Sequence, residues 1–458
     1  MGSLNVAEWI EARPISTWQL WVFFLCGLTA IMDGIDLNAL AYAAPVVVRT
    51  MHVAPAALAP ALSASLFGLM VGALIGSPLA DRIGRKMVVV LSVLSFGVFS
   101  LFVATATSVP QLVLWRFLSG LGLGGSMPNV IAMANEYAPR RAQKAAVSIM
   151  FIGVPLGGSL AALIAAHLLP ARGWPPLFID VLGLPAIGVA VVDFLWLPES
   201  IRYLVVQQKP APQILQILRR IDSRAALDPE TRFFLPEATS RAFPVSRLFV
   251  GANARNTPLL WVMFFMNLAI VYFLGNWLPT ILHASGLSLA TAIYASQMET
   301  AGGVLGGLVM GAWLLQRMTN QKRLVVGIFS ATTLSLLLLG LLPKSPAALF
   351  VLLFVNGFFV LGTQFVINAL AAALYVTAAR STGVGWALGW GRLGSILSPL
   401  VGGILVADHA GLPTVFGVAA VSALLGGVAG VLLRARSGGA LGADEEPGAG
   451  MEPVANAP

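Results

Sequence analysis

The stretch LTAIMDGIDLNALAYAAP, residues 28–45, places two carboxylates, Asp33 and Asp36, inside an otherwise apolar run. The run covers residues 18–48, and about 20 helical residues suffice to cross the ~30 Å hydrocarbon core of a bilayer. A charged side chain near the centre of a membrane helix costs on the order of 2.5 kcal/mol or more, so such acids usually serve a function. Because Asp33 and Asp36 are three residues apart, they share one helix face. This stretch therefore predicts a membrane-spanning helix with a functional pair of acids.

The composition of the whole chain is that of a membrane protein with many spans. Of its 458 residues, 58% are hydrophobic and 10% are charged, whereas soluble domains carry about 25% charged residues. The net charge of +8 does not indicate nucleic-acid binding, because the basic residues are scattered between apolar segments. The single cysteine, Cys26, excludes an intramolecular disulfide and makes a metal cluster unexpected. Residues 1–17 lack the pattern of a signal peptide, so we expect the first span to direct insertion.

Twelve apolar segments are bounded by proline, glycine or charged clusters. They cover residues 18–47, 57–80, 87–106, 110–134, 145–169, 176–197, 258–281, 289–315, 323–342, 347–376, 383–406 and 412–433. Of the 27 Lys and Arg residues, three fall in outer connections and two within spans: Arg49, Arg172 and Lys344, then Arg116 and Arg392. Because basic residues concentrate in cytoplasmic loops, this asymmetry predicts that both termini are cytoplasmic.

The longest hydrophilic gap divides these segments into two groups of six. The predicted organisation is a six-helix bundle over residues 1–197, a cytoplasmic linker over 198–257, a second six-helix bundle over 258–434 and a disordered cytoplasmic tail over 435–458. In the linker, Ile214, Leu218 and Ile221 share one side of an amphipathic stretch, which predicts a helix lying on the membrane surface. The predicted fold class is an all-α polytopic membrane protein with twelve transmembrane helices in two bundles.

The two halves resemble each other when they are slid by about 235 positions. An offset of 235 places Gly68, Gly72 and Gly76 on Gly303, Gly307 and Gly311. An offset of 234 places Asp33 on Asn267 and Pro45 on Pro279. An offset of 237 places Gly120 on Gly357 and Gly125 on Gly362. A duplicated helical bundle with a long cytoplasmic linker resembles the parallel repeat of a major facilitator transporter.

The connection after the second segment reads GSPLADRIGRK, residues 76–86. Asp81, Arg82 and Arg85 can form ion pairs at a cytoplasmic helix end, and glycines at every fourth position before them allow close helix packing. This loop is similar to the signature loop of the major facilitator superfamily and predicts a gate that holds one conformation closed. Positive-inside charges alone would explain the arginines but not Asp81. The second copy has Gln316 where an acid is expected, which predicts a weaker gate.

The fourth segment carries Arg116 within WRFLSGLGLGGSMPN, residues 115–129. An arginine inside a membrane needs an anion as its partner. Two interpretations remain open at this point. Arg116 either takes part in substrate binding or proton coupling, or forms a fixed salt bridge between the fourth and first segments.

Several motifs together resemble the aromatic acid:H⁺ symporter family. They are DGID at residues 33–36, RFLSGLGLGGSMPN followed by NEYAPRR, PESIRYL after the sixth segment, WVMFFMNLAIVYFLGNWLP in the seventh, and GTQFVINALAAALY with GVGWALGWGRLGS near the end. The resemblance extends over nearly the whole chain. It implies roles for the acids and arginines that match the family motifs, which are Asp33, Asp36, Asp81, Arg116, Arg380 and Arg392.

An aromatic acid needs a cation for its carboxylate and flat apolar walls for its ring. The candidates for binding it are arginines, amides and aromatic side chains within the spans: Arg116, Arg392, Asn267, Asn276, Gln364, Asn368, Tyr272, Phe273 and Trp386. The candidates for proton coupling are Asp33, Asp36 and Glu299, of which Glu299 has the alternative of pairing with Arg392. The gating candidates are charged residues at the cytoplasmic ends of the spans: Asp81, Arg82, Arg85, Glu136, Arg140 and Arg380.

The remaining titratable residues near the spans have structural interpretations. Asp180 and Asp193 lie near the two ends of the sixth segment, where they are expected to reach the membrane interface. The four histidines, His52, His167, His283 and His409, fall near external loops and are expected at the surface.

These features predict proton-coupled uptake of an aromatic carboxylate of the hydroxybenzoate type by alternating access. The alternative is a proton symporter for another organic anion, such as a dicarboxylate, a quinate-like acid or a nicotinate-like acid. An external proton is expected to neutralise the Asp33 and Asp36 pair, which titrates as a unit, before the substrate binds. The sequence contains no HExxH or GxSxG motif, so we expect no enzyme activity.

The expected setting is a bacterial cytoplasmic (inner) membrane, in which the protein is a monomer. Its expected partners are the aromatic acid, protons and the lipid bilayer, with no nucleic acid and no metal. We expect no cofactor, because the proton gradient supplies the driving force.

Overall fold

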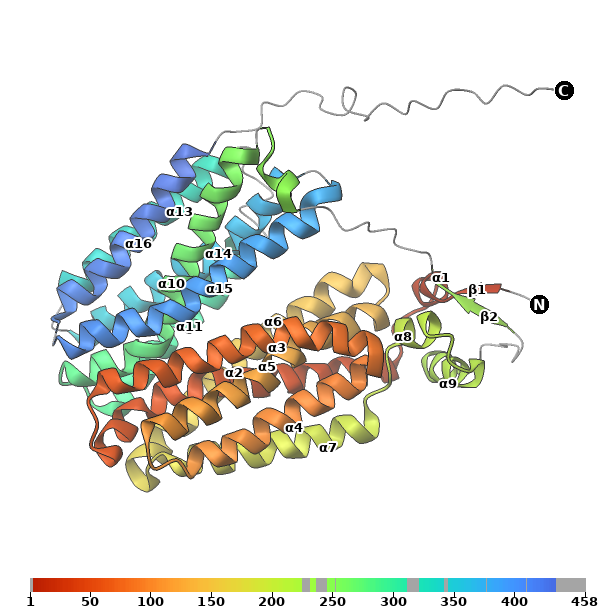
Figure 1. Ribbon diagram of the computed structural model, residues 1–458, viewed down its shortest axis with the longest axis horizontal. Helices are drawn as coiled ribbons and strands as arrows, with labels where there is room; N and C mark the ends of the chain where they lie inside the picture. The colour runs from red at the N-terminus through yellow and green to blue at the C-terminus, as the bar shows by residue number, and fades with distance from the viewer. Residues whose placement is uncertain are drawn as a thin grey trace.

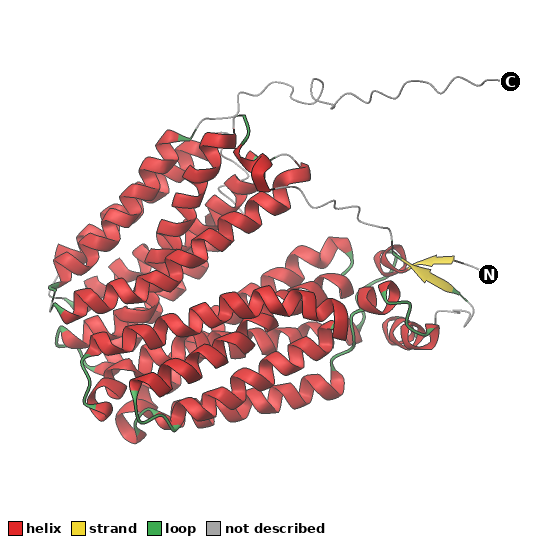
Figure 2. Cartoon of the chain, viewed as in Figure 1, coloured by secondary structure: helices red, strands yellow, loops and turns green. Residues whose placement is uncertain are grey.

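The computed structural model describes residues 3–224, 231–235, 245–251, 253–310, 321–341, 345–375, 377–408 and 410–433. Figure 2 shows that the described chain is almost entirely helical, with two short strands. Its twelve long helices form two bundles (Figure 1), which confirms the predicted fold class. The predicted tail and the second copy of the gating loop, at Gln316, lie outside the described residues.

The first bundle follows the six predicted segments of the N-terminal half. It consists of α2 (Thr17–Met51), α3 (Ala59–Ile83), α4 (Arg85–Ala104), α5 (Val109–Tyr137), α6 (Arg140–Arg172) and α7 (Leu184–Trp196). The 3-10 helix η1 (Pro55–Leu58) precedes α3, and the π-helix η2 (Leu177–Gly183) leads directly into α7. Helix α2 begins with a capping box, in which Ser16 and Gln19 each accept a hydrogen bond from the other's backbone N–H. It continues through Pro45 to Met51 and so carries both acids of the DGID motif in one helix.

The second bundle follows the six predicted segments of the C-terminal half. It consists of α10 (Asn253–Ala284), α11 (Leu289–Val309), α13 (Gln321–Leu341), α14 (Pro346–Leu374), α15 (Thr377–Ala407) and α16 (Leu412–Leu432). Eleven helical segments of the described chain are long and apolar enough to cross a membrane. The twelfth long helix is α11, whose described part carries the polar residues Gln297 and Glu299.

Glycines make the closest helix contacts in both bundles. A side chain at Gly68 would collide with a backbone carbonyl of α5, and one at Gly120 with the carbonyl of Ser65, so α3 and α5 pack backbone against backbone. In the second bundle, Gly302 and Gly306 bring α11 against the backbone of α14 in the same way. The packing glycines of α3 and α11 therefore correspond at an offset of 234 and not 235, the same offset that places Asp33 on Asn267.

A small cap joins the N-terminal segment to the linker at one end of the first bundle (Figure 1). In it, β1 (Ser3–Asn5) pairs in parallel with β2 (Arg232–Phe234), next to α1 (Val6–Glu11), α8 (Ile201–Val206) and α9 (Ala211–Ile221), while η3 (Val245–Phe249) leads into α10. The apolar side chains of α9 are buried in the protein, with Leu218 0% exposed. Helices α8 and α2 pack against α9. The expectation that this helix lies on the membrane surface is therefore wrong, because the protein covers its apolar face.

An ion pair fixes the end of α9 to the N-terminal segment. Arg13 Nε lies 2.8 Å from Asp222 Oδ2, and the guanidinium also lies over the Trp9 ring at 3.6 Å. The hydrogen bond from Arg13 lowers the pKa of Asp222 from its ordinary value of 3.8. Because the folded pKa is the lower one, the contribution to stability is present above the ordinary value and is lost as pH falls through the folded value. The pair is therefore fully formed at neutral pH.

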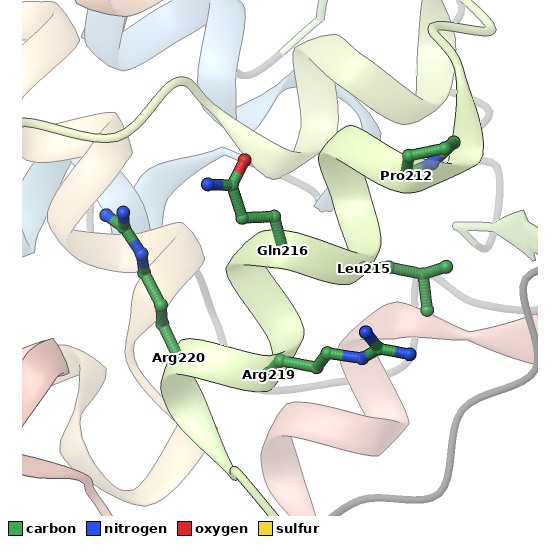
Figure 3. A pocket seen from close by; sticks show the side chains of 5 residues that line it. All are labelled: Pro212, Leu215, Gln216, Arg219 and Arg220. Carbon is green, nitrogen blue, oxygen red and sulfur yellow. The ribbon is translucent and has the colours of Figure 1, made fainter.

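The exposed side of α9 carries a hollow of about 440 Å³. Figure 3 shows its lining and shows that the two arginines point in different directions; the lining residues are Pro212, Leu215, Gln216, Arg219 and Arg220. The hollow belongs to the cap and includes none of the predicted site residues, which lie in the two bundles and at their ends.

The two bundles converge at the end remote from the cap and diverge toward the cap (Figure 1). We call the first of these the convergent end. There α10 packs on α2, α11 on α6, and α15 on α3 and η1. Among the described residues, three polar contacts cross between the bundles: Tyr42 with Gln297, Arg49 with His283 at 2.8 Å, and His167 with Tyr294 at 3.2 Å. His167 is exposed, as expected, and His283 is partly buried, and both connect the two bundles; His409 lies outside the described residues.

Candidate functional site

A buried ion pair joins α2 to α5 in the first bundle. Arg116 Nη1 lies 2.8 Å from Asp36 Oδ1, with side-chain exposures of 3% and 0%. The same carboxylate oxygen accepts hydrogen bonds from Ser119 at 3.1 Å and Ser100 at 3.4 Å, and Arg116 donates to Ser65 at 3.0 Å. This geometry is that of the fixed salt bridge. Because Asp36 already neutralises Arg116, the guanidinium is not free for a substrate carboxylate in this conformation, contrary to the substrate-binding role expected for it.

Asp33 lies on the same helix in a different environment. It is 1% exposed, and its Oδ2 accepts a hydrogen bond from Ser126 at 2.6 Å. Its Oδ1 has no hydrogen-bond partner in the described part of the chain. The two acids that the sequence treated as one pair thus differ: a cation neutralises Asp36, whereas the hydroxyl of Ser126 is the only hydrogen-bond partner of the Asp33 carboxylate among the described residues.

The serines around these acids were not among the predicted site residues. Ser119 and Ser126 are seven residues apart on α5, so they lie on one face of that helix, toward α2. The glycines around them allow α3 to approach until Ser65 reaches Arg116. The signal that could have identified these serines is their helical spacing within the glycine-rich motif.

Glu299 occupies the position in the second bundle that Ser65 occupies in the first. Gly120 of α5 packs on the backbone of Ser65, and Gly357 of α14 packs on the backbone of Glu299 in the same manner. Glu299 is 9% exposed, and no described residue forms a hydrogen bond or an ion pair with its carboxylate. The alternative that it pairs with Arg392 is therefore wrong within the described chain. Two residues before it, Gln297 donates to Tyr42 of the other bundle.

Arg392 is the second arginine within a membrane helix and has a neutral partner. Its Nη1 donates to the hydroxyl of Tyr272 on α10 at 2.9 Å, and its guanidinium carbon lies 6.0 Å from the centroid of that ring. Both side chains are partly buried. Among the described residues, no acid lies within ion-pairing distance of Arg392. Its charge is therefore available to an anion from outside the chain.

Three predicted amides form a chain of hydrogen bonds between α10 and α14. Asn267 Nδ2 donates to Gln364 Oε1 at 2.9 Å, and Gln364 Nε2 donates to Asn368 Oδ1 at 3.1 Å. Asn267 is 0% exposed, whereas Gln364 and Asn368 are partly exposed. The fourth predicted amide, Asn276, donates to the backbone carbonyl of Tyr272 at 2.7 Å and does not join the chain.

The two predicted aromatic contacts lie apart from this group. Phe273 is 5% exposed and packs in the core of the second bundle. Trp386 is 46% exposed and stacks on Trp261 at 6.0 Å between ring centroids, and Trp390 stacks on the same ring at 5.2 Å. Since Trp386 precedes Arg392 by six residues on α15, the two side chains point to different sides of that helix.

The gating residues pair differently from the expectation. Arg85 forms an ion pair with Glu136, which also accepts a hydrogen bond from Ser200 at 2.5 Å. Asp81 and Arg82 are exposed, and their backbone carbonyls accept hydrogen bonds from the linker side chains Gln207 and Tyr203. The backbone N–H of Arg140 donates to Glu11, and Arg380 is exposed. Arg85 thus connects α4 to α5 within the first bundle through its ion pair with Glu136, and Asp81 takes no part in this pair.

The PESIRYL motif supplies two further residues of this cluster that were not predicted as site residues. Glu199 accepts hydrogen bonds from the backbone N–H groups of Lys86 at 3.0 Å and Ser200 at 2.8 Å, and Tyr137 donates to its backbone carbonyl at 2.5 Å. The motif ties the end of α7 to the start of α4 and the end of α5. The acid and serine directly after a membrane segment are the signal that could have marked it.

The other acids of the first bundle have structural partners. Asp193, expected near the interface, is 0% exposed and accepts a hydrogen bond from Thr29 at 2.9 Å. Asp180 lies 3.7 Å from Arg172 at the surface. Within the described ranges, no group of three His, Cys, Asp or Glu side chains could hold a metal ion.

Comparisons with known proteins agree with this architecture. The family model of the major facilitator superfamily matches residues 26–343 and 322–455. The chain is 36% identical to the gallate transporter of Pseudomonas putida, over 90% of this chain and 91% of that one. It is 38% identical to the 4-hydroxybenzoate transporter of Pseudomonas aeruginosa, over 88% and 90%. Among solved structures, a bacterial homologue of the human lysosomal transporter Spinster, inward-facing and unoccupied, shares the fold with a TM-score of 0.64 and 16% identity, over 92% of this chain and 98% of that one.

Proposed function

Because this chain belongs to the major facilitator superfamily and its relatives include transporters of gallate and 4-hydroxybenzoate, we propose that it takes up an aromatic carboxylate of the hydroxybenzoate type together with protons. The chain is an integral membrane protein. Transport by this fold requires the two bundles to rock about a site between them, so that the site opens to one side of the membrane at a time. The substrate is released unchanged.

The observation that carries the proposal is the charge of Arg392. It has a phenol and no carboxylate as its partner in the described chain. A partly buried guanidinium without an anion is disfavoured within a membrane, and a carboxylate can bind its fork of N–H donors in a bidentate way. Arg116 lacks this property, since Asp36 neutralises it. We therefore assign the substrate carboxylate to Arg392, with the Tyr272 ring beside it as an aromatic wall.

Proton coupling is assigned to two of the buried acids that form no ion pair within the described chain, Asp33 and Glu299. Asp33 in the first bundle contacts the Ser126 hydroxyl, and Glu299 in the second has no partner among the described residues. A proton on either acid removes a charge that the membrane interior disfavours. Binding of a proton and of the substrate anion together leaves a neutral load, which lowers the cost of moving between the two open states. The proton gradient is then the only driving force, with no cofactor.

The proposed setting is the bacterial cytoplasmic membrane, with both termini and the cap on the inner side. The distribution of basic residues supports this orientation. In it, the convergent end faces outward, and the bundles diverge toward the cytoplasm (Figure 1). The protein is proposed to work as a monomer, because each chain carries both halves of the site.

The test is uptake of radiolabelled 4-hydroxybenzoate into proteoliposomes with an imposed gradient, acidic outside. We expect accumulation above the equilibrium level, its loss on addition of a protonophore, and recovery of unchanged label from the lumen. Asp33→Asn should abolish accumulation above the equilibrium level while retaining flow of label down its own gradient, because substrate movement is then no longer coupled to the proton gradient.

The matched control for that variant is Asp193→Asn, because Asp193 is also a buried acid of this bundle with one hydroxyl partner. This control should accumulate substrate as the parent does. Full accumulation by Asp33→Asn would overturn the proton assignment. Competition of unlabelled benzoates, nicotinate and aliphatic dicarboxylates with labelled 4-hydroxybenzoate then distinguishes a carrier of aromatic acids from a carrier of other anions. Stronger inhibition by dicarboxylates than by benzoates would overturn the substrate assignment.

A further inference from the structure

One polar contact between the bundles at the convergent end is buried on both sides. Gln297 of α11 donates through Nε2 to the hydroxyl of Tyr42 of α2, and the two residues are 9% and 2% exposed. The other two contacts that cross between the bundles among the described residues, through His283 and His167, each include one exposed side chain. The contact of Tyr42 with Gln297 is therefore the one of the three that is shielded from water.

Along α2, this contact lies between the convergent end and the buried acids. Tyr42 is seven residues before Arg49, a helical rise of about 10.5 Å, and six residues after Asp36, a rise of about 9 Å. On α11, Gln297 is two residues before Glu299. The contact thus forms a second layer of the convergent end, deeper than the exposed contacts and nearer to the acids.

The two side chains are held differently within their own bundles. The Tyr42 hydroxyl donates to the backbone carbonyl of Gly158 of α6 at 3.4 Å, so its own bundle fixes its position. Since a tyrosine hydroxyl has one proton, it offers the other bundle an acceptor lone pair. The Gln297 Oε1 is buried and has no partner among the described residues, so opening of this layer would hydrate an acceptor that is now unpaired. The contact is therefore a single neutral hydrogen bond that a change of conformation can break at low cost.

The internal repeat provides an equivalent pair of positions, which is not hydrogen-bonded. The offset of 234, which relates the packing glycines of α3 and α11, places Tyr42 on Asn276 and Ser63 on Gln297. Asn276 donates within its own helix to the carbonyl of Tyr272, and the buried Ser63 hydroxyl has no partner in the part of the chain that the structure describes. The duplicated fold therefore does not by itself produce this contact, which depends on the particular side chains of Tyr42 and Gln297.

We propose that Tyr42 and Gln297 form the inner gate of the convergent end, and that their hydrogen bond holds this end closed and breaks when the site opens to the outside. The proposal rests on the proposed function, in which this end faces outward and the bundles rock about a site between them. A neutral hydrogen bond changes an equilibrium constant by about two- to tenfold. This is enough to favour the closed state and small enough to be reversed in every transport cycle.

The experiment measures the distance between the bundles in the full chain, reconstituted in lipid nanodiscs. Spin labels at Thr50→Cys and Ser285→Cys, in a Cys26→Ser background, report a short population for the closed end and a long one for the open end. Tyr42→Phe and Gln297→Met remove the hydrogen bond with little change in side-chain size. Each should lower the ratio of the short to the long population by about two- to tenfold.

The double variant tests whether the two residues act through one contact. It should shift the ratio by the same factor as either single variant, because the second substitution then has no bond left to remove. The matched control is Ser63→Ala, since Ser63 takes the position of Gln297 in the repeat and its hydroxyl has no partner in the described chain. Its ratio should equal that of the parent.

Unchanged ratios in both single variants would overturn this inference, and so would a double variant whose shift is the product of the two single shifts. A lower unfolding temperature without a change in the ratio would likewise assign the contact a purely structural role. These outcomes leave the proposed function intact. A parent that accumulates no 4-hydroxybenzoate would overturn the proposed function, whereas the distance measurement needs no substrate and decides the gate separately.

Discussion

Arg116 and Arg392 lie away from the ends of their membrane helices, and they differ in what neutralises them. Arg116 lies 2.8 Å from a carboxylate, and serine hydroxyls from α3, α4 and α5 surround that pair. Arg392 instead donates to the phenol hydroxyl of Tyr272. Breaking a buried ion pair leaves an uncompensated charge and costs more than removing both partners. We therefore assign a structural role to Arg116 and propose that Arg392 binds the substrate anion.

This difference predicts that Asp36→Asn destabilises the protein. It would leave Arg116 without its anion at an exposure of 2%, which costs about 3–5 kcal/mol. The measurement is urea unfolding of the purified protein in detergent. The double variant Asp36→Asn with Arg116→Gln should recover most of the loss, since no buried charge then remains. Equal stability of Asp36→Asn and the parent would contradict the structural role of this pair.

Among the helices, the contact of α3 with α5 decides where these side chains meet. Gly120 packs directly on the backbone of Ser65, so no side chain fits between the helices at that point. The contact brings Ser65, on α3, to the guanidinium of Arg116, on α5. In the second bundle, Gly357 of α14 packs on the backbone of Glu299 of α11 in the equivalent way. The two halves therefore share this helix packing and differ in the side chain at the contact, which is Ser65 in the first half and Glu299 in the second.

Gly120→Val is expected to force α3 and α5 apart and to break the hydrogen bond from Arg116 to Ser65. Overpacking of this kind costs about 1–3 kcal/mol or more, and we expect a lower unfolding temperature together with lower uptake. Gly188→Ala on α7 is the control, since nothing lies within 4 Å of the added atom. If both variants matched the parent in unfolding temperature, the close packing at Gly120 would not be required.

In the molecule as a whole, the two bundles are joined at the convergent end by contacts that include two imidazoles. His283 Nδ1 lies 2.9 Å from the carbonyl of Leu287, and its Nε2 lies 2.8 Å from Arg49 Nη2. Both distances are satisfied when neutral His283 carries its proton on Nδ1 and accepts from Arg49. A protonated imidazole has no acceptor nitrogen and would place a second cation beside the guanidinium. This contact therefore requires neutral His283.

Loss of this contact is accordingly expected to loosen the convergent end. Spin labels at Thr50→Cys and Ser285→Cys, in a Cys26→Ser background, should report a longer distance in His283→Leu than in the parent, because Arg49 then lacks its partner in the other bundle. His52→Leu, at an exposed position at the end of α2, is the control. An unchanged distance in His283→Leu would contradict this role of the contact.

The sequence by itself determined the membrane class, the twelve helices, the duplication and the location of the buried acids. These follow from hydropathy, proline and glycine boundaries and the cost of charge in a membrane, which are all local properties of the chain. The resemblance of the motifs also indicated the family. Arg392, Asn267 and Gln364 were identified as site candidates because polar side chains in a bundle need partners.

Only the tertiary structure decided which partners these side chains have. In the folded chain, Arg116 pairs with Asp36, whereas Arg392 has no acid as a partner among the described residues. The apolar face of α9 packs against the protein and not against the membrane. Such choices depend on which helices meet and at what depth, and residues 80 positions apart in the sequence have no local signal of their distance. The physical reason is that a buried charge is stabilised by whatever neighbour the packing supplies, and packing is a property of the whole fold.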